Sequence, residues 1–418
     1  MIWWQRSVNI CLVDALAGQN QTIVIKVFLN TEPELKFAIQ TANITCERLD
    51  SGNIKENKFM NDSYKLLIVD DSKMMRNAIR AIFAADDRIQ VAGEAADGEA
   101  ALEIIPQIDP DVLTMDVNMP VMDGLTTLKH MMIETPKPTV MVSTLTQEGA
   151  SLTFDALKFG AVDFVSKPSK LNESKLEGQE KTVARKVALA AQVEIEAIRY
   201  IRDVPKGESS RPSRQVACDR FIAIGAAEGG YGALLKVVPH LRPELPATYL
   251  AVIHAASQHV DAFARYLDDS SSIRVKRAID GLPVEGGICY LGAGEEYITI
   301  QSHNSGLFLQ VQPAPFKSMS ERRGSINMLM FSAAEVMGNR AVGIVLSGAG
   351  NDGAEGMAEI IRSGGKTLIQ DPKSCLYKEM AKSALEKCEL DGVIPDIRIA
   401  SAVNNFLFNG NRIHSRAD

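Results

Sequence analysis

The sequence lacks the features that mark secreted, membrane-spanning or metal-stapled proteins. Its six cysteines are scattered over 418 residues, and no two have the close spacing of a zinc or dithiol redox site. No apolar run approaches the ~20 residues that a membrane-spanning helix needs. Arg6 and Asp14 interrupt the N-terminal segment, which makes it a poor signal peptide. We therefore expect a reduced, cytoplasmic protein with no direct membrane insertion.

Excess charge of one sign is also absent. The 52 acidic and 45 basic residues give a formal net charge of −7, which provides no general attraction for nucleic acid or anionic membranes. Hydrophobic residues make up 46% of the chain and charged residues 23%, so two or more ordinary globular cores can form. We expect a multidomain protein whose partners are proteins and not nucleic acid.

The two ends of the chain carry no motif. Residues 1–63 form an unassigned N-terminal extension, although residues 22–30 (TIVIKVFLN) could be a strand. Met60 stands just ahead of the first clear pattern, so translation starting there is an alternative. Residues 410–418 are expected to be a tail.

Residues 64–170 alternate between short apolar strands and helices. Strands are expected at 66–71, 90–95, 112–116, 139–144 and 162–167, and helices at 73–86, 98–108, 124–133 and 152–160. Apolar strands between helices predict a parallel sheet covered on both faces. Five such repeats predict a flavodoxin-like doubly wound α/β domain, whose functional residues gather at the carboxyl ends of its strands.

Polar side chains end four of these strands, namely Asp70 with Asp71, then Asp116, Ser143 and Lys167. They should converge in one pocket. Three close carboxylates repel one another, and a hard divalent cation relieves that repulsion. The pattern predicts a Mg²⁺ site, and an aspartate beside bound Mg²⁺ can accept a phosphoryl group while the cation and Lys167 balance the charge.

The motifs DD, MDVNMP, VST and FVSKP at these intervals resemble the receiver domain of two-component response regulators over its whole length. The resemblance implies a sensor histidine kinase as phosphodonor. By this resemblance, Asp116 is the phosphoacceptor. The Mg²⁺ ligands are Asp70, Asp71, Asp116 and the Asn118 carbonyl. The residues at the switch positions are Ser143, Lys167 and Phe164. For Phe164, ordinary core packing is an equal alternative.

Residues 171–217 are predicted to be a helical and flexible linker, because the tract KGESSRPSR has too little apolar content to pack. Residues 218–409 are expected to form a second, Rossmann-like parallel α/β domain, with strands near 221, 248, 288, 342 and 366. In it, residues 221–235 (FIAIGAAEGGYGALL) read as a strand, a glycine-rich turn and a helix start. Several hydrolases present a catalytic serine on such a turn, yet here the turn holds Ala227.

Two other strand ends of this domain carry His254, in TYLAVIHA, and Asp352, in GAGNDGAEGM. Together with the turn at Ala227 they resemble the catalytic domain of the chemotaxis protein-glutamate methylesterases. Ala227, His254 and Asp352 then occupy the positions of the family's serine, histidine and aspartate. The resemblance implies a receptor-modifying methylesterase and glutamine deamidase that acts on the cytoplasmic tails of methyl-accepting chemoreceptors.

The missing hydroxyl predicts weak or absent hydrolysis, because removing a triad nucleophile typically lowers turnover about 10⁶-fold. The sequence also departs from the family at Ala255, Ala256, Ala349 and Asn327. Hydrolysis without the serine has two alternative routes. A water molecule could be activated by His254, or Glu228 or Ser257 could act as a replacement nucleophile.

Two further functions stay open. The domain could have become a non-catalytic regulator that binds receptors or a kinase. In addition, Gly348, Gly350 and Gly353 spell the dinucleotide-binding pattern G-x-G-x-x-G between a strand and a helix, although Asp352 would repel a pyrophosphate there.

Overall fold

The computed structural model describes residues 63–84, 86–143, 147–167, 173–198, 200–201, 216–304, 306–315 and 324–409. The predicted strand at 22–30, the flexible tract at 206–214 and the tail at 410–418 lie outside these residues. The chain divides into two units, Met1–Met60 and Asn61–Asp418, and the second holds every element described below. None of the described helices is both long and apolar enough to cross a membrane.

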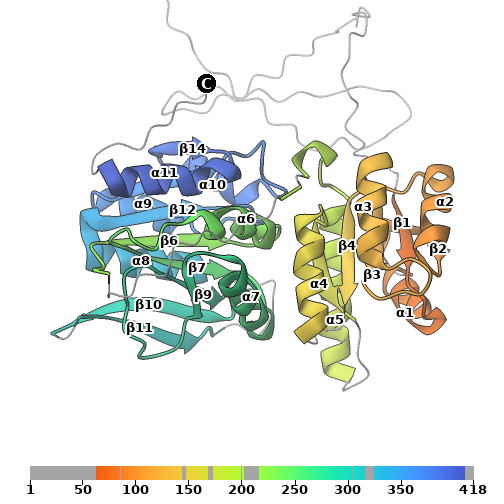
Figure 1. Cartoon of the computed structure of the whole chain (residues 1–418), viewed down its shortest axis with the longest axis horizontal. Helices are drawn as coiled ribbons and strands as arrows, with labels where there is room; N and C mark the ends of the chain where they lie inside the picture. Colours follow the sequence, from red (N-terminus) through yellow and green to blue (C-terminus); the bar gives the residue numbers. More distant parts are fainter. Residues whose placement is uncertain are drawn as a thin grey trace, which may run out of the picture. The chain divides into compact units, whose positions relative to one another are not determined.

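The first domain is a five-stranded parallel sheet in the order β2-β1-β3-β4-β5 (Figure 1). Its strands are β1 (Tyr64–Val69), β2 (Ile89–Ala95), β3 (Val112–Asp116), β4 (Thr139–Ser143) and β5 (Asp163–Ser166). Its helices are α1 (Lys73–Phe83), α2 (Gly98–Ile108), α3 (Gly124–Glu134), α4 (Gln147–Lys158) and α5 (Glu173–Ala190). This strand order is that of flavodoxin-like domains, so the predicted fold class is confirmed.

Local sequence explains why helices begin so close to the strand ends. The side chains of Ser72, Asp97 and Asp123 cap α1, α2 and α3 by accepting hydrogen bonds from backbone amides of the first turn. Gly124 lets α3 begin against the end of β3, because a Cβ atom there would lie 1.9 Å from the Asp116 carbonyl oxygen. Short connections of this kind hold the strand ends in a fixed place.

Helix α5 belongs to the first domain, although the sequence analysis placed its residues in the linker. It packs against β3, β4, β5 and α1, with Val183 and Val187 buried. The first sheet therefore has a fifth covering helix in the range that composition alone assigned to a connection. The 3₁₀ turn η1 (Ile195–Ala197) follows it.

The second domain is a seven-stranded parallel sheet in the order β14-β13-β12-β6-β7-β9-β8. The strands are β6 (Arg220–Ala226), β7 (Ala247–Ile253), β8 (Arg274–Arg277), β9 (Ile288–Ala293), β12 (Ala341–Val345), β13 (Lys366–Gln370) and β14 (Gly392–Ile394). The five strands predicted for this domain are present, and β8 and β14 are additional. A separate antiparallel hairpin joins β10 (Glu296–His303) to β11 (Gly306–Pro313) (Figure 1).

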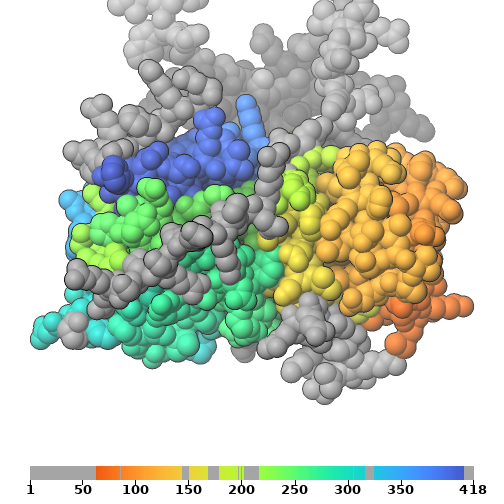
Figure 2. All heavy atoms as spheres, viewed as in Figure 1, coloured from red at the N-terminus to blue at the C-terminus, as the bar shows by residue number. Residues whose placement is uncertain are grey.

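Helices cover both faces of this sheet. Alternate residues of β6 divide between them, since Phe221 and Ala223 pack on one side and Ile222 and Ile224 on the other. One face carries α6 (Gly230–Val237), α7 (Ser257–Ser270) and α11 (Asp396–Asn409), and the other α8 (Ser325–Met337), α9 (Ala354–Arg362) and α10 (Glu379–Lys387). Two 3₁₀ turns, η2 (Val238–His240) and η4 (Gly338–Arg340), complete the connections. Helix α11, blue in Figure 2, lies at the surface and exposes Phe408.

The two domains share an aromatic cluster, in which helix α4 of the first packs on α6 and α7 of the second. The ring of Phe154 in α4 is fully buried. Its centroid lies 5.9 Å from that of Tyr231 in α6 and 4.9 Å from that of Phe263 in α7. Aromatic pairs at such distances contribute beyond the area that they bury. A buried cluster that bridges the two domains predicts that they unfold together.

Replacing Phe154 by alanine should lower the free energy of unfolding by about 3–5 kcal/mol, the usual cost of deleting a buried phenylalanine ring. Because the ring bridges both domains, differential scanning calorimetry should also resolve two unfolding transitions for the variant in place of one for the wild type. The control is Leu152→Ala in the same helix, where the side chain is partly exposed. A Phe154→Ala profile identical to that of the control would contradict the coupling.

Candidate functional site

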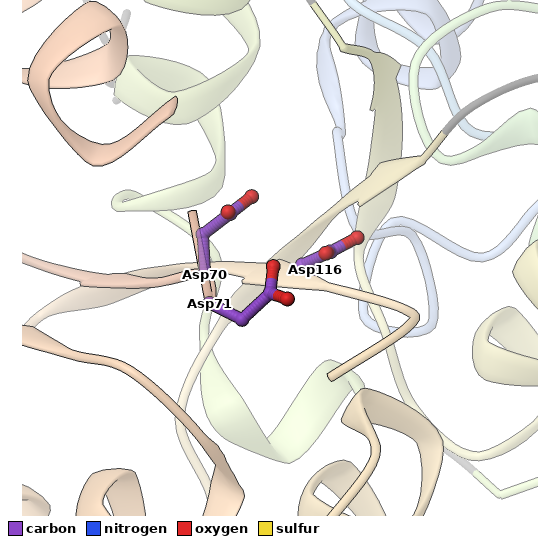
Figure 3. A group of neighbouring side chains, drawn as sticks. All are labelled: Asp70, Asp71 and Asp116. Carbon is purple, nitrogen blue, oxygen red and sulfur yellow. The ribbon is translucent and has the colours of Figure 1, made fainter. Parts of the chain in front are cut away.

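The first candidate site is an acidic pocket at the ends of β1 and β3 (Figure 3). Carboxylate oxygens of Asp70, Asp71 and Asp116 lie within 4.8 Å of one another, with Asp70 and Asp116 buried and Asp71 exposed. The two strands pair in parallel, so their carboxyl ends meet at one edge of the sheet. The structure thus brings the three predicted acids together.

Lys167 supplies the positive charge of the pocket. Its Nζ atom lies 2.6 Å from Asp116 Oδ2 and 3.3 Å from Asp70 Oδ2. Burial lowers the pKa of Lys167, but the hydrogen bond and charge of Asp116 together with the charge of Asp70 prevail and raise that pKa above its ordinary value. For Asp116, burial raises the pKa, and Lys167 offsets only part of this rise. The Asp116 carboxylate is therefore more basic than an exposed aspartate.

The pocket fits a hard cation. Asp70 Oδ2 is buried, and among the described residues its polar contact is the ion pair of 3.3 Å with Lys167. All three side chains offer carboxylate oxygens, which are the ligands that Mg²⁺ prefers. The exposed Asp71 borders solvent, and the backbone amide of Asn118 stabilises the ionised form of Asp116. A receiver-type acidic pocket of this composition is suited to Mg²⁺.

Two of the predicted switch residues lie in the neighbouring strands β4 and β5. Ser143 is buried at the end of β4, and its carbonyl accepts a hydrogen bond of 2.9 Å from the Lys167 amide. Phe164 in β5 is also buried, so core packing is part of its role. Its ring lies 5.0 Å from that of Tyr231 and 5.4 Å from that of His259, both in the second domain. Phe164 is therefore placed between the acidic pocket and the second domain.

The second candidate site surrounds the turn between β6 and α6. Ala227 is buried at this turn, and its amide donates to the Ser347 carbonyl at 3.0 Å. Gly229 has φ +73°, a conformation that favours glycine, and a Cβ atom there would lie 2.8 Å from Ser347 Oγ. The sharp strand-to-helix turn is therefore present, with a methyl group at the position where such turns carry a nucleophile.

His254 and Asp352 meet beside this turn. The His254 amide donates to the Ala226 carbonyl at 3.0 Å, and His254 Nε2 lies 2.9 Å from Asp352 Oδ2. Asp352 also accepts hydrogen bonds from the amides of Ile326 and Asn327 at 3.0 Å. The structure thus brings the three residues Ala227, His254 and Asp352 to one place, with the histidine oriented by the aspartate.

Asp352 is ionised in this arrangement. Burial by itself would raise the pKa of its carboxyl, but the hydrogen bond and charge of His254 and the amides of Ile326 and Asn327 together outweigh burial. They hold the pKa of Asp352 below its ordinary value. A negatively charged Asp352 can stabilise a positively charged His254.

Several amides at the glycine-rich turn after β12 already donate to partners within the domain. The Gly353 amide donates to Asp352 Oδ1 and to Asn327 Oδ1, at 2.9 and 3.1 Å, and the Gly356 amide donates to Asn327 Oδ1 at 2.8 Å. Gly348 is needed for packing, because a Cβ atom there would lie 2.1 Å from Met380 Sδ. The amides of Gly353 and Gly356 therefore have internal acceptors, and the Asp352 carboxylate beside them would repel a pyrophosphate.

The two replacement nucleophiles considered from the sequence have other partners. Ser257 donates from its amide and its hydroxyl to Glu295 Oε2, at 2.9 and 3.1 Å. The Glu228 carboxylate pairs with Arg185 and accepts from the Ala349 amide. Among the described residues, no hydrogen bond joins either side chain to His254.

A family model of the CheB methylesterase matches residues 222–403, and one of the response regulator receiver domain matches residues 66–176. A protein-glutamate methylesterase/protein-glutamine glutaminase of Pyrococcus horikoshii is 37% identical over 351 residues, which are 82% of this chain and 94% of the relative. The chain belongs to the CheB family. It is a chemotaxis response regulator with a receiver and a methylesterase domain.

A second CheB relative, from Xanthomonas euvesicatoria, is 36% identical over 344 residues, which are 80% of this chain and 95% of the relative. The solved CheB methylesterase catalytic domain of Thermotoga maritima is 26% identical, with a TM-score of 0.41, and the match covers 44% of this chain and 95% of that one.

Sequence reasoning missed the role of Arg185. This residue lies in α5, within the range assigned to the linker, and its guanidinium pairs with Glu228 at the turn between β6 and α6. The only sequence signal was the helical propensity of the segment, which does not identify a partner.

The state of Asp352 predicts a pH-dependent stability. An aspartate whose pKa is lower in the folded than in the unfolded protein stabilises the fold above the unfolded value of about 3.9, and the stabilisation is lost as the pH falls through the folded value. Asp352→Asn should therefore be less stable than the wild type at neutral pH by about 1–3 kcal/mol, and the gap should narrow below about pH 4.

Urea unfolding at several pH values checks this prediction. Asn327→Ala is the matched control. The Asn327 side chain accepts hydrogen bonds from neighbouring amides but does not titrate, so the loss of unfolding free energy in this variant should not depend on pH. A constant gap between Asp352→Asn and the wild type down to about pH 3 would contradict the ionised state assigned to Asp352.

Proposed function

We propose that this chain is a phosphorylation-controlled chemotaxis regulator in which the methylesterase domain hydrolyses weakly or not at all. The observation that carries the proposal is Ala227, a residue without a hydroxyl group, on an otherwise intact strand-to-helix turn beside a paired His254 and Asp352. Without a nucleophilic oxygen no acyl-enzyme can form at this position.

In the receiver domain, Asp116 is the proposed phosphoacceptor and a sensor histidine kinase the phosphodonor. Asp70, Asp71, Asp116 and the Asn118 carbonyl would hold Mg²⁺, which when bound neutralises part of the charge of the phosphoryl group. Lys167 already contacts Asp116 and Asp70, so its ammonium group can pair with the phosphoryl group added to Asp116. The basic character of the buried Asp116 supports its assignment as acceptor.

The proposed control of the second domain passes through Phe164 and Ser143. Phe164 packs on the rings of Tyr231 and His259, and Ser166 beside it lies 3.2 Å from His259 Nε2. An acyl phosphate that repositions Ser143 would change this packing and shift the population of domain arrangements. Helices α6 and α7 begin three residues after Ala227 and His254, at Gly230 and Ser257, so such a change would reach the second site.

The proposed partners are the cytoplasmic tails of methyl-accepting chemoreceptors, and the relatives are named as enzymes that act on protein glutamate esters and glutamines. A binding role without hydrolysis is the second candidate, and the absent hydroxyl at Ala227 favours it. Either role places the protein in the cytoplasm, where receptor tails and sensor kinases are found.

Incubation with a small phosphodonor such as acetyl phosphate and Mg²⁺ should label the protein once, at Asp116. Asp116→Asn should abolish the labelling, because an amide cannot form an acyl phosphate. Intact-mass spectrometry measures the adduct. Asp123→Asn is the control, since Asn keeps the capping ability of Asp123 at α3. Equal labelling of Asp116→Asn would overturn the assignment.

The wild type should hydrolyse a peptide that carries a glutamate γ-methyl ester about 10⁶-fold more slowly than a triad enzyme. His254→Ala should change this residual rate little, as should the control His240→Ala at an exposed position. Methanol release over hours measures the rate. Rapid wild-type turnover that persists in His254→Ala would contradict both the catalytic and the binding version and would indicate a different site.

A further inference from the structure

The side chain of Glu228 lies where a site of this layout would bind negative charge. In enzymes with a nucleophile on a strand-to-helix turn, the oxyanion is bound by the backbone amide of the next residue and by an amide of a neighbouring loop. Here the next residue is Glu228. The neighbouring loop is the turn after β12, because the Ala227 amide donates to Ser347 and a Cβ atom on Gly348 would lie 2.8 Å from Ala227 Cβ.

The Glu228 carboxylate contacts groups that favour an anion. Its Oε2 atom accepts a hydrogen bond of 3.3 Å from the Ala349 amide in the turn after β12. Its Oε1 atom pairs with the guanidinium of Arg185 in α5. The side chain is 9% exposed, so little of it faces water. Glu228 thus connects three segments, the turn after β6, the turn after β12 and helix α5.

The carboxylate is ionised in this setting. Burial by itself would raise the pKa of Glu228, but the charge and hydrogen bond of Arg185, the residue's own backbone amide and the charge of His254 outweigh it and hold the pKa below its ordinary value. The amide of Glu228 and the amide of Ala349 therefore both act on one internal anion.

We propose that Glu228 is an internal carboxylate ligand of the esterase-like site, held by Arg185 and the Ala349 amide in the position that an external carboxylate or ester carbonyl would otherwise take. This proposal rests on the proposed function only for the location of the site. The ligand that the site would take in the absence of the Glu228 carboxylate is a small carboxylate, such as a glutamate side chain. It follows that returning a hydroxyl with Ala227→Ser does not suffice for hydrolysis, because Glu228 excludes the ester carbonyl.

Acetate binding tests the proposal without reference to activity. Glu228→Ala should bind acetate saturably, with a dissociation constant on the order of millimolar for so small a ligand. Wild type should not, because the position is filled. Glu228→Gln is the matched control, since it keeps the volume without the charge and should also bind no acetate. The double variant Arg185→Ala/Glu228→Ala should lose the binding that Glu228→Ala gains.

Binding is followed by the melting temperature and by ¹³C-acetate NMR line widths, with chloride at equal ionic strength as reference. Should Glu228→Ala fail to fold, Glu228→Ser takes its place. A folded variant that binds no more acetate than the wild type overturns the proposal. So does acetate binding that is equal in the wild type.

Hydrolysis by serine variants separates this proposal from the proposed function. Ala227→Ser/Glu228→Ala should exceed Ala227→Ser by about 10²-fold or more, the usual effect of freeing an oxyanion donor, while Ala227→Ser/Glu228→Gln should not. Hydrolysis that is measurable and equal in Ala227→Ser and Ala227→Ser/Glu228→Ala would overturn the internal-ligand proposal. If Glu228→Ala binds acetate and no serine variant hydrolyses the ester, the internal ligand is established and the catalytic assignment of His254 and Asp352 fails.

Discussion

The parallel pairing of β6 with β12 is the constraint on which the second site depends. These strands are more than 100 residues apart in the chain, yet their register from Phe221 opposite Ala341 to Gly225 opposite Val345 makes the two following turns emerge side by side. Strand order changes direction at this pair, and ligands of open α/β sheets bind at such switch points. Because β7 pairs with the other side of β6, the same edge also receives His254.

In the first domain, parallel strand pairing also brings functional side chains together, but here they interact through charge and not through hydrogen-bonded turns. Pairing of β1 with β3 forces Asp70 and Asp116 together, and two buried carboxylates are costly unless they are balanced. Lys167 balances them from the end of β5. Any change of charge at Asp116 therefore acts on β5, whose Phe164 touches α6 and α7. The two sites are linked because helices that start at one of them pack against the strand that ends at the other.

Topology explains which features the sequence predicts. The group Ala227, His254 and Asp352 was expected from the resemblance to the methylesterase family. The acidic pocket follows from strand positions alone, because residues at the ends of parallel strands converge whatever the side-chain rotamers. The pair of Arg185 with Glu228 does not, because it depends on where α5 docks, and the charged, weakly apolar segment carries no periodic signal for that. The hairpin of β10 and β11 was missed for a related reason, since its strands carry polar residues on their exposed face.

The retained pair of His254 and Asp352 has a structural explanation that does not require catalysis. Asp352 accepts hydrogen bonds from the first-turn amides of α8, which have no acceptor within their own helix. Losing this carboxylate would leave buried donors unsatisfied, which costs stability in any variant of the domain. Glu228 meets a similar need at the Ala349 amide. Anions therefore remain at both turns for reasons of folding. His254 is the informative group, because its side chain has Asp352 as its hydrogen-bond partner and none of the amides that the structure describes donates to it.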